Sequence, residues 1–286
     1  MVRTVNNIKT VLLLGALFAL VVFIGGVLGR GPGILIAGVI ATVMNVGAWF
    51  FSDKIAIKSM RGQEVSPDSP GGRDLYAMVE RLSERAGLPT PRVYICPHDA
   101  PNAFATGRSP KHAAVAFTQG LLRIMNQAEL EGVAAHELAH IKNRDTLTST
   151  VAATVAGIFS MLSQWFFLFG GGLGGGRRDG VHPLLGLGMV LLGAFGAAVI
   201  KGMISRSREF VADADGAEIA GSPHGLASAL TKLDTMARRV PLQQPNPAMN
   251  NLFIVEPFMG RGLTELFASH PPTEKRVAAL LGTEIG

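Results

Sequence analysis

The chain has 286 residues, 48% of them hydrophobic and only 16% charged, and it carries a formal net charge of +5. Such a composition is too apolar for an ordinary soluble domain and favours membrane-spanning helices. A basic chain can bind nucleic acid, but this one has no basic patch interleaved with aromatic residues, so we expect no nucleic-acid partner.

Four runs free of Asp, Glu, Lys and Arg each provide the roughly 20 residues that a helix needs to cross the hydrocarbon core of a bilayer. They cover residues 10–29, 31–52, 146–170 and 181–200. We predict four transmembrane helices arranged as two hairpins. The first helix is expected to be an uncleaved anchor rather than a signal peptide, because a second span follows almost at once.

The positive charges predict the orientation of these helices. Only Arg30, Arg177 and Arg178 lie in the two short loops between paired spans, and the other 23 of the 26 Lys and Arg residues lie on the opposite side. By the positive-inside rule that opposite side is cytoplasmic, and both termini lie there. The sequence therefore predicts a multi-pass protein of the cytoplasmic (inner) membrane, in contact with the lipid bilayer.

The spans divide the chain into a transmembrane hairpin at 1–52, a polar segment at 53–145, a second hairpin at 146–204 and a polar segment at 205–286. Neither polar segment alone carries a complete metal site, so we predict one cytoplasmic domain interrupted by the second hairpin. The glycine-rich stretch 170–180 then serves as a flexible connector outside the membrane. The expected fold is a mainly α membrane protein with a mixed α+β domain on the cytoplasmic side.

The first polar segment predicts a helix followed by a small sheet. The helix is expected at 73–86, between a linker rich in Ser, Pro and Gly and the helix-stopping sequence GLPTP. A strand at 93–96 ends at Cys96, which we expect to be a buried thiol, and a single cysteine excludes an internal disulfide. Residues 102–107 and 113–118 predict a hairpin, which either holds an extended peptide at its edge or merely covers the next helix.

That next helix carries the pentapeptide HELAH. Asn126 followed by Glu129 predicts an N-cap with a capping box. Residues four apart lie one turn above each other on a helix, so His136 and His140 point the same way and can occupy two corners of a zinc tetrahedron. Glu137, about 100° around the helix, is then placed to act on a water molecule rather than to bind the metal. The alternative is a pair of exposed helix histidines beside a solvated glutamate.

A zinc site of this kind needs a third ligand, and the second polar segment offers several candidates: Glu209, Asp213, Asp215, Glu218, Glu256, Glu265, Glu274 and His270. Glu209 and Asp213 lie four residues apart on one predicted helix face, so one can bind the metal while the other accepts a hydrogen bond from an imidazole N–H. If both helices run straight on from the third and fourth spans, His140 lies about 9 Å and Glu209 about 12 Å beyond the hydrocarbon edge. The alternative is a solvated helix face.

Two other classes of zinc site fit the sequence poorly. A metzincin would need Gly and His where this chain has Asn143 and Thr146. A site within the membrane is disfavoured because Lys142, Arg144 and Asp145 closely follow the HEXXH sequence.

Together these motifs resemble the HtpX heat-shock family of integral-membrane metalloproteases, which belongs to the gluzincin group and is related to the CAAX prenyl protease. The resemblance rests on HEXXH, on REFVAD at 208–213, on NAFATG at 102–107 and on SHPPTEKR at 269–276. It covers nearly the whole chain, includes four spans, and implies a gluzincin-type zinc protease domain on the cytoplasmic side.

The resemblance also implies how the metal site is divided among its residues. His136, His140 and Glu209 would bind one Zn²⁺ ion, and Glu137 would be the catalytic base. Asp213 would not bind the metal itself but would form a hydrogen bond with one of the ligands.

Residues outside the metal site receive roles from the same resemblance. Asn102 and Ala103 would lie on the strand that holds the substrate, and His270 and Arg276 would lie near the reacting carbonyl or the substrate backbone. From the residues alone, His270 could equally begin a helix and Arg276 could equally be a surface cation. The histidines without a spaced partner are expected at turns or on the surface: His98, His112, His182 and His224.

The sequence therefore predicts a zinc-dependent endopeptidase of the membrane, acting on membrane proteins or membrane-associated polypeptides. By resemblance, its role is the quality control of misfolded or damaged membrane proteins. The alternatives are a non-catalytic zinc-binding membrane scaffold and a zinc transporter or sensor. A transporter would need ionisable groups within its spans, and the four runs contain no Asp, Glu, Lys or Arg.

Overall fold

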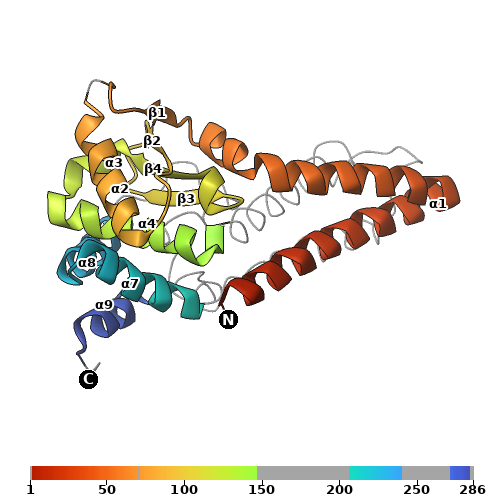
Figure 1. Cartoon of the computed structure of the whole chain (residues 1–286). Helices are drawn as coiled ribbons and strands as arrows, with labels where there is room; N and C mark the ends of the chain where they lie inside the picture. Colours follow the sequence, from red (N-terminus) through yellow and green to blue (C-terminus); the bar gives the residue numbers. More distant parts are fainter. Residues whose placement is uncertain (1, 70, 147–205, 240–270, 284–286) are drawn as a thin grey trace.

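The computed structural model describes residues 2–69, 71–146, 206–239 and 271–283, and a four-stranded sheet lies in the upper part of its body, as viewed in Figure 1. Its strands lie in the order β1-β2-β4-β3, with β1 and β3 at the edges. The central pair, β2 and β4, is parallel, and both edge strands run antiparallel to their neighbours. The strands are β1 (Gln63–Val65), β2 (Arg92–Cys96), β3 (Ala103–Gly107) and β4 (Ala113–Thr118).

Strand β4 shows how the alternation of small and larger apolar residues covers both faces of the sheet. Val115 and Phe117 are fully buried on the face that packs against helices α2 and α4. Ala114 and Ala116 point to the other face, where Ile57 from the end of helix α1 packs on them. Burying a side chain such as Val or Phe contributes about 1.5–3 kcal/mol, so both helical layers hold the sheet in place.

Each helix beside the sheet has a recognisable signal at one of its ends. Helix α2 (Arg73–Ala86) ends at Gly87, which adopts a left-handed conformation with φ 67°. The short helix α3 (Gln119–Ile124) follows a 3-10 turn, η1 (Pro110–His112), and strand β4, and it is capped by the side chain of Thr118. Helix α4 (Gln127–Asn143) has the predicted capping box between Asn126 and Glu129. These local signals place α4 directly under the sheet.

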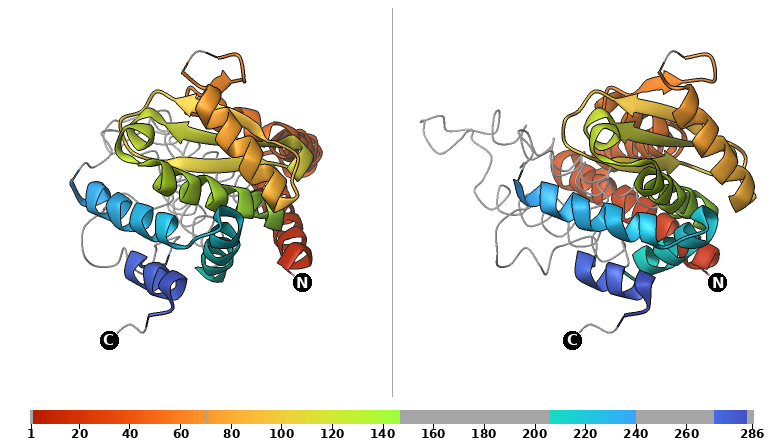
Figure 2. Two further views of the ribbon diagram at one scale, coloured as in Figure 1. Left: turned by 60° about the vertical axis from the view of Figure 1, so that its left-hand side comes forward. Right: turned by 90° about the vertical axis from the view of Figure 1, so that its left-hand side faces the viewer.

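Three further helices pack below α4: α7 (Arg206–Ala220), α8 (His224–Arg239) and α9 (Thr273–Leu281) (Figures 1 and 2). Glycines allow their backbones to approach closely. A Cβ atom at Gly132 of α4 would lie 2.5 Å from the backbone nitrogen of Leu226, and one at Gly225 would lie 2.2 Å from the carbonyl oxygen of Ala128. Helices α4 and α8 can therefore cross at this distance only because these positions lack side chains.

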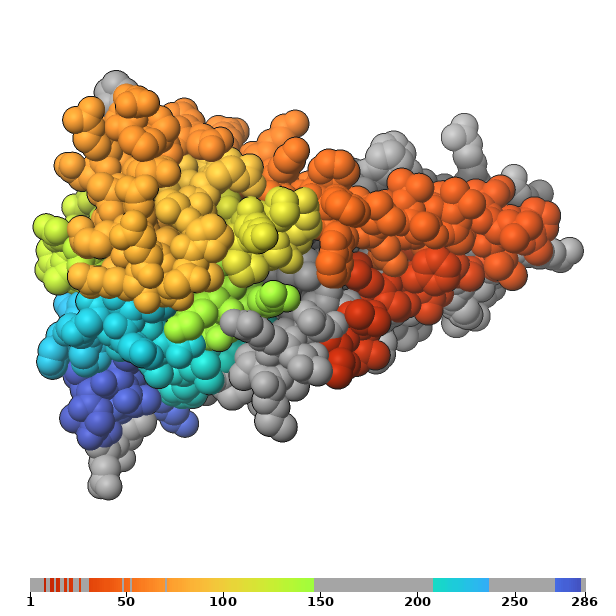
Figure 3. All heavy atoms as spheres, viewed as in Figure 1, coloured from red at the N-terminus to blue at the C-terminus, as the bar shows by residue number. Residues whose placement is uncertain are grey.

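Helix α1 (Val2–Ser59) is folded back on itself and projects from the body as a long arm (Figures 1 and 3). The Asn45 Nδ2 atom donates a hydrogen bond to the Leu14 carbonyl oxygen at 3.0 Å, whereas these residues would lie about 46 Å apart on a straight helix. A Cβ atom at Gly26 would lie 3.1 Å from the Ile34 side chain, so the bend lies between these residues. Pro32 lies in this interval and cannot donate a helical hydrogen bond. The two halves of α1, before and after this bend, therefore lie side by side, as expected for a hairpin.

One stretch of the described residues, Gly31–Phe51, is long and apolar enough to cross a bilayer by its length and composition. It matches the predicted span 31–52, and the span predicted at 10–29 lies on the same helix. Large apolar side chains such as Leu35 and Val39 are 74% and 66% exposed, which suits contact with lipid rather than with water. The spans predicted at 146–170 and 181–200 and the glycine-rich stretch between them lie outside the described residues, Thr146 excepted.

The structure corrects one expectation about the helices next to the membrane. Helix α1 extends beyond the candidate span, to Ser59, and leaves that prediction unchanged. The straight continuation expected for the HEXXH helix is wrong, because α4 ends at Asn143 and Arg144 adopts a left-handed conformation with φ 58°. The chain turns at this residue, so the depths calculated for straight helices do not hold.

Candidate metal centre

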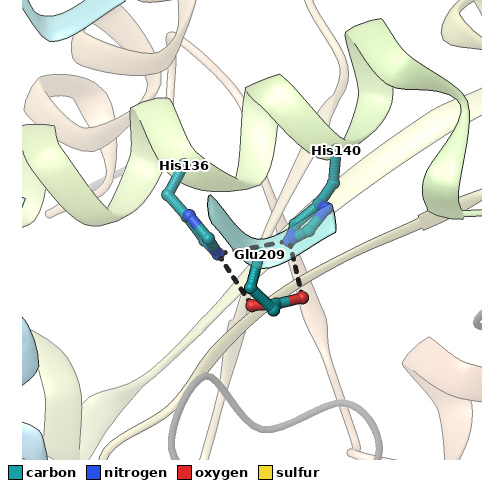
Figure 4. A group of neighbouring side chains, drawn as sticks. All are labelled: His136, His140 and Glu209. Atoms are coloured by element: carbon teal, nitrogen blue, oxygen red, sulfur yellow. Dashed lines mark hydrogen bonds and ion pairs between the residues drawn. The ribbon is translucent and has the colours of Figure 1, made fainter. Parts of the chain in front are cut away.

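Helix α4 brings His136 and His140 together on one side, one turn apart (Figure 4). Their rings meet edge to face, with centroids 4.6 Å apart, and their Nε2 atoms lie 3.2 Å from each other. His136 is 1% exposed, whereas the side chain of His140 is 16% exposed. Both histidines thus direct the same ring atom to one point, and the His140 side of that point is the more open.

Glu209 reaches this point from helix α7 (Figure 4). Its Oε2 atom lies 3.8 Å from His136 Nε2, and its Oε1 atom lies 3.7 Å from His140 Nε2. Glu209, Asp213 and Gly216 are spaced so that they share one face of α7. A Cβ atom at Gly216 would lie 2.9 Å from the His136 Cα atom, so this glycine allows α7 to lie directly against the HEXXH turn.

These donor atoms fit a tetrahedral zinc ion. Zinc–nitrogen and zinc–oxygen bonds of about 2.0–2.1 Å at tetrahedral angles separate neighbouring ligand atoms by about 3.3–3.4 Å. Each of His136, His140 and Glu209 offers one ligand atom, and these atoms all lie within 4.8 Å of one another. Two imidazoles and one carboxylate are also a donor set that leaves a fourth position for water or substrate.

A buried ion pair supports the His136 side of the cluster. The Arg276 guanidinium donates to both oxygens of Asp213, from Nε at 2.8 Å and from Nη2 at 2.7 Å. Asp213 Oδ1 lies 3.0 Å from His136 Nδ1, which has no well-aligned hydrogen bond among the described residues. Burial raises the pKa of Asp213, but the hydrogen bond from Arg276 and then the contact with His136 outweigh it, so this pKa lies below its usual range.

Arg276 also indicates which nitrogen of His136 carries the proton. Its Nη2 atom lies 3.5 Å from His136 Nε2, and a guanidinium can only donate. Nε2 is then the acceptor, and Nδ1 carries the hydrogen that faces Asp213. The lone pair of Nε2 is therefore directed toward the cluster.

Asp145 supports the His140 side. Its Oδ2 atom lies 3.2 Å from His140 Nδ1, and its Oδ1 atom accepts from Arg208 Nη1 at 3.4 Å. Burial lowers the pKa of His140, but the hydrogen bond to Asp145 and the charges of Glu209 and Glu137 outweigh burial and raise it to about 9. Without metal, both ring nitrogens of His140 are therefore protonated at neutral pH. A metal cation must displace one of these two protons in order to bind.

The structure brings some of the predicted site residues together and leaves others apart. Glu137 lies on α4 between the two histidines in sequence, and it is buried, with 4% of its surface exposed. Arg276 is 1% exposed, which excludes the alternative of a surface cation. His270 lies outside the described residues.

Ala103 begins the edge strand β3 and Asn102 immediately precedes it, and both residues are buried. The Asn102 N–H donates to the Thr118 hydroxyl, and its carbonyl accepts from the Thr118 N–H, so its backbone is held against β4.

The three other histidines in the described part of the chain have surroundings of their own. His98 is part-buried, with Nε2 3.1 Å from the Met60 carbonyl oxygen. His112 and His224 are exposed, as expected, and His182 lies outside the described residues.

The sequence does not identify Asp145 and Arg208 as supports of the site. Asp145 indicates only that the histidines lie outside the membrane, although ligand histidines commonly donate their second N–H to a carboxylate. The signal was weak because Asp145 points toward His140 only after the turn at Arg144.

An HEXXH helix whose two histidines meet a carboxylate from a second helix defines the class of this protein as a metallopeptidase. The model of Peptidase family M48 matches residues 71–284. Over 278 residues the chain is 50% identical to the protease HtpX homolog of Pelotomaculum thermopropionicum, covering 96% of this chain and 98% of that relative. It is also 49% identical over 290 residues to the homolog of Nostoc punctiforme, covering 98% of this chain and 96% of that relative. The chain belongs to peptidase family M48 and is a homolog of the HtpX proteases.

The crystal structure of S. mikatae Ste24p shares this fold. The match has a TM-score of 0.52 at 17% sequence identity, and it covers 98% of this chain and 66% of that one. At this identity the likeness concerns the fold alone. The fold is thus a mainly helical M48 protease fold with a small sheet, as the sequence predicts in its coarse outline.

Proposed function

We propose that this M48 metallopeptidase is a membrane-anchored zinc endopeptidase whose ligands are His136, His140 and Glu209. The observation that carries the proposal is the convergence of two Nε2 atoms and one carboxylate within 4.8 Å of one another. This donor set and spacing suit Zn²⁺, and we propose one ion per chain, held by this cluster in the described part of the chain.

The catalytic steps fall to the residues around the ligands. A zinc ion held by these three ligands would act as a Lewis acid. It would lower the pKa of a water molecule and polarise a peptide carbonyl. Glu137 takes the proton from the attacking water and passes it to the leaving amine, which is general acid–base catalysis by one carboxylate. Asp213 and Asp145 keep the Nδ1 protons of His136 and His140 in place, so that both Nε2 lone pairs face the metal.

Four other residues are assigned to the substrate. Ala103 begins the edge strand β3 and Asn102 precedes it, and an extended polypeptide can add beside this strand as a further one. Arg276 lies 3.5 Å from His136 Nε2, close enough to the metal face to stabilise negative charge on the reacting carbonyl. His270, six residues before Arg276 in the chain, is assigned to the same carbonyl by its sequence motif.

The substrates are proposed to be membrane proteins or membrane-associated polypeptides that are misfolded or damaged. Support comes from the apolar helix Gly31–Phe51, which leads directly into the body that carries the metal cluster. Lys54, Lys58 and Arg61 are exposed just after this stretch, where cytoplasmic residues meet anionic headgroups. This charge pattern supports the proposal that the active site and both termini lie on the cytoplasmic side of the inner membrane.

Three forms of the full chain in detergent test this function: the wild type, Glu137→Gln and Glu209→Ala. We expect Glu137→Gln to bind zinc and to lose cleavage of a model membrane protein by at least about 100-fold, because it removes the base and no ligand. Glu209→Ala should lose the zinc itself. Retained cleavage in Glu137→Gln would refute the mechanism, and zinc binding without cleavage in the wild type would favour a scaffold. Glu131→Gln on the same helix is the matched control.

A further inference from the structure

Each histidine of the cluster has its own carboxylate, and the two carboxylates are held in different ways. Asp213 is fixed by Arg276 and lies on the same helix as Glu209. Asp145 follows α4 and is 2% exposed, and it pairs with Arg208, which is 8% exposed. These two buried charges lie on either side of residues 147–205, so their contact joins the two polar segments of the chain.

The contact between Asp145 and His140 depends on the end of α4. On a continuous helix, a residue five positions later lies about 140° around the axis and points away. Here Arg144 adopts a left-handed backbone conformation with φ 58°, which residues other than glycine rarely adopt. The turn carries Asp145 back, so that its Oδ2 atom lies 3.2 Å from His140 Nδ1.

We propose that Asp145, held by Arg208, is a positioning residue that sets His140 and Glu209 at the distance a metal ion requires. One oxygen of Asp145 faces the ligand histidine, and the other accepts from Arg208, which is the neighbour of Glu209 in sequence. One carboxylate therefore links a ligand on α4 to the first turn of α7. This inference rests on the proposed zinc site and assigns to it a residue that the HEXXH motif does not contain.

The test uses the full-length protein in detergent and compares Asp145→Asn with the wild type. Zinc affinity is measured by competition with a chelator, and Co²⁺ bound in place of zinc reports the ligand geometry through its visible spectrum. We expect zinc affinity to fall by about 10–100-fold and the Co²⁺ spectrum to shift, because such partners orient the ligand ring. Glu131→Gln, which breaks the pair with Arg81 on the exposed side of α4, should change neither.

Each outcome decides a separate point. A wild type that binds no zinc would overturn the proposed function and this inference with it. If the wild type binds zinc and Asp145→Asn has the same affinity and the same Co²⁺ spectrum, only this inference is overturned, even if the metal-free protein melts earlier. If Asp145→Asn does not fold, Arg208→Gln takes its place, since it leaves His140 and Asp145 intact. An unchanged zinc affinity in Arg208→Gln would show that the contact between Arg208 and Asp145 does not position the metal ligands, and it would overturn this inference.

Discussion

The burial of Arg276 is the feature at the scale of single residues that the rest of the metal centre depends on. Its guanidinium forms two hydrogen bonds with Asp213 and lies 3.7 Å from Glu209 Oε2. The guanidinium thereby places one positive charge between two buried carboxylates. Removing one member of a buried charged group leaves the others without compensation.

We therefore expect Arg276→Leu to lower the free energy of unfolding by about 3–5 kcal/mol and to weaken zinc binding. Thermal unfolding of the metal-free protein and chelator competition measure the two effects separately. Arg123→Leu is a suitable control, because Arg123 pairs with Asp99 on the surface and should have little effect on either quantity. An Arg276→Leu variant as stable as the control would show that the buried pair contributes no net stability.

At the scale of helices, the distance between α4 and α7 is set by a missing side chain. A Cβ atom at Gly216 would lie 2.9 Å from His136 Cα and 3.0 Å from its nitrogen, and backbone atoms cannot yield as a flexible side chain can. A larger residue at this position must push α7 away from α4, and Glu209 and Asp213 would move with it.

Gly216→Ala should therefore weaken zinc binding, although alanine favours a helix by about 1 kcal/mol over glycine. Zinc titration and thermal unfolding of this variant are compared with those of Gly38→Ala, since a Cβ atom at Gly38 would meet no atom within 4 Å. We expect the control to keep its zinc affinity. Equal zinc affinity in both variants would mean that α7 can shift without disturbing its ligand.

Glu129 joins α4 to α8 and predicts how stability depends on pH. It accepts hydrogen bonds from Lys232 at 2.6 Å and from Ser228 at 2.8 Å, in addition to its capping bond. Burial raises the pKa of Glu129, but Lys232, the Asn126 N–H and Ser228 together lower it below its ordinary value of 4.5. A lowered folded-state pKa contributes stability above the unfolded-state value and loses it as the pH falls through the folded-state value.

The melting temperature should therefore fall below about pH 4.5 more steeply in the wild type than in Glu129→Gln. At pH 7, Glu129→Gln should itself be less stable, by about 2 kcal/mol, because the cap and the charged bond to Lys232 are weakened. Parallel pH profiles for the two proteins would exclude Glu129 as the titrating group. Both profiles are recorded without metal, so that zinc release does not contribute.

At this scale, features encoded by neighbouring residues could be predicted from the sequence, and contacts between distant residues could not. The helix at 73–86, the hairpin before α4 and the capping box at Asn126 were predictable, because each is encoded by neighbouring residues. Strand β1 has three residues and no alternating pattern to reveal it. The burial of Arg276 was not predictable, since its partner Asp213 lies 63 residues away. The left-handed Arg144 was missed because arginine gives no sign of such a turn.

At the scale of the whole molecule, helix α1 is both an anchor and a wall of the protease body. Arg92 Nη2 donates to Asp53 Oδ2 at 2.6 Å, and Arg108 Nη1 donates to the Phe50 carbonyl oxygen at 3.3 Å. The Arg108 guanidinium also lies 5.2 Å from the centroid of the Phe50 ring. These contacts fix the end of the candidate membrane span to the sheet.

Shortened chains test this double role. A chain that begins at residue 53 keeps Ile57 and Met60, which cover the outer face of the sheet, whereas one that begins at residue 63 exposes that face. We expect the second chain to aggregate and the first to elute as a single species, because an open apolar face of this kind promotes association. Gel filtration of both in the same detergent measures the difference. Equal behaviour would show that α1 only anchors.

The position of Arg276 has a consequence for the order in which the enzyme is made. Ribosomes build a chain from its N-terminus, and His136 is synthesised 140 residues before Arg276. Until α9 has emerged and packed against α7, Asp213 and Glu209 lack the guanidinium that balances their charges. The growing chain can already lie in the membrane beside other newly made proteins at this stage. It then has both histidines, but its metal site is incomplete. We expect proteolysis to begin only after translation has passed this helix.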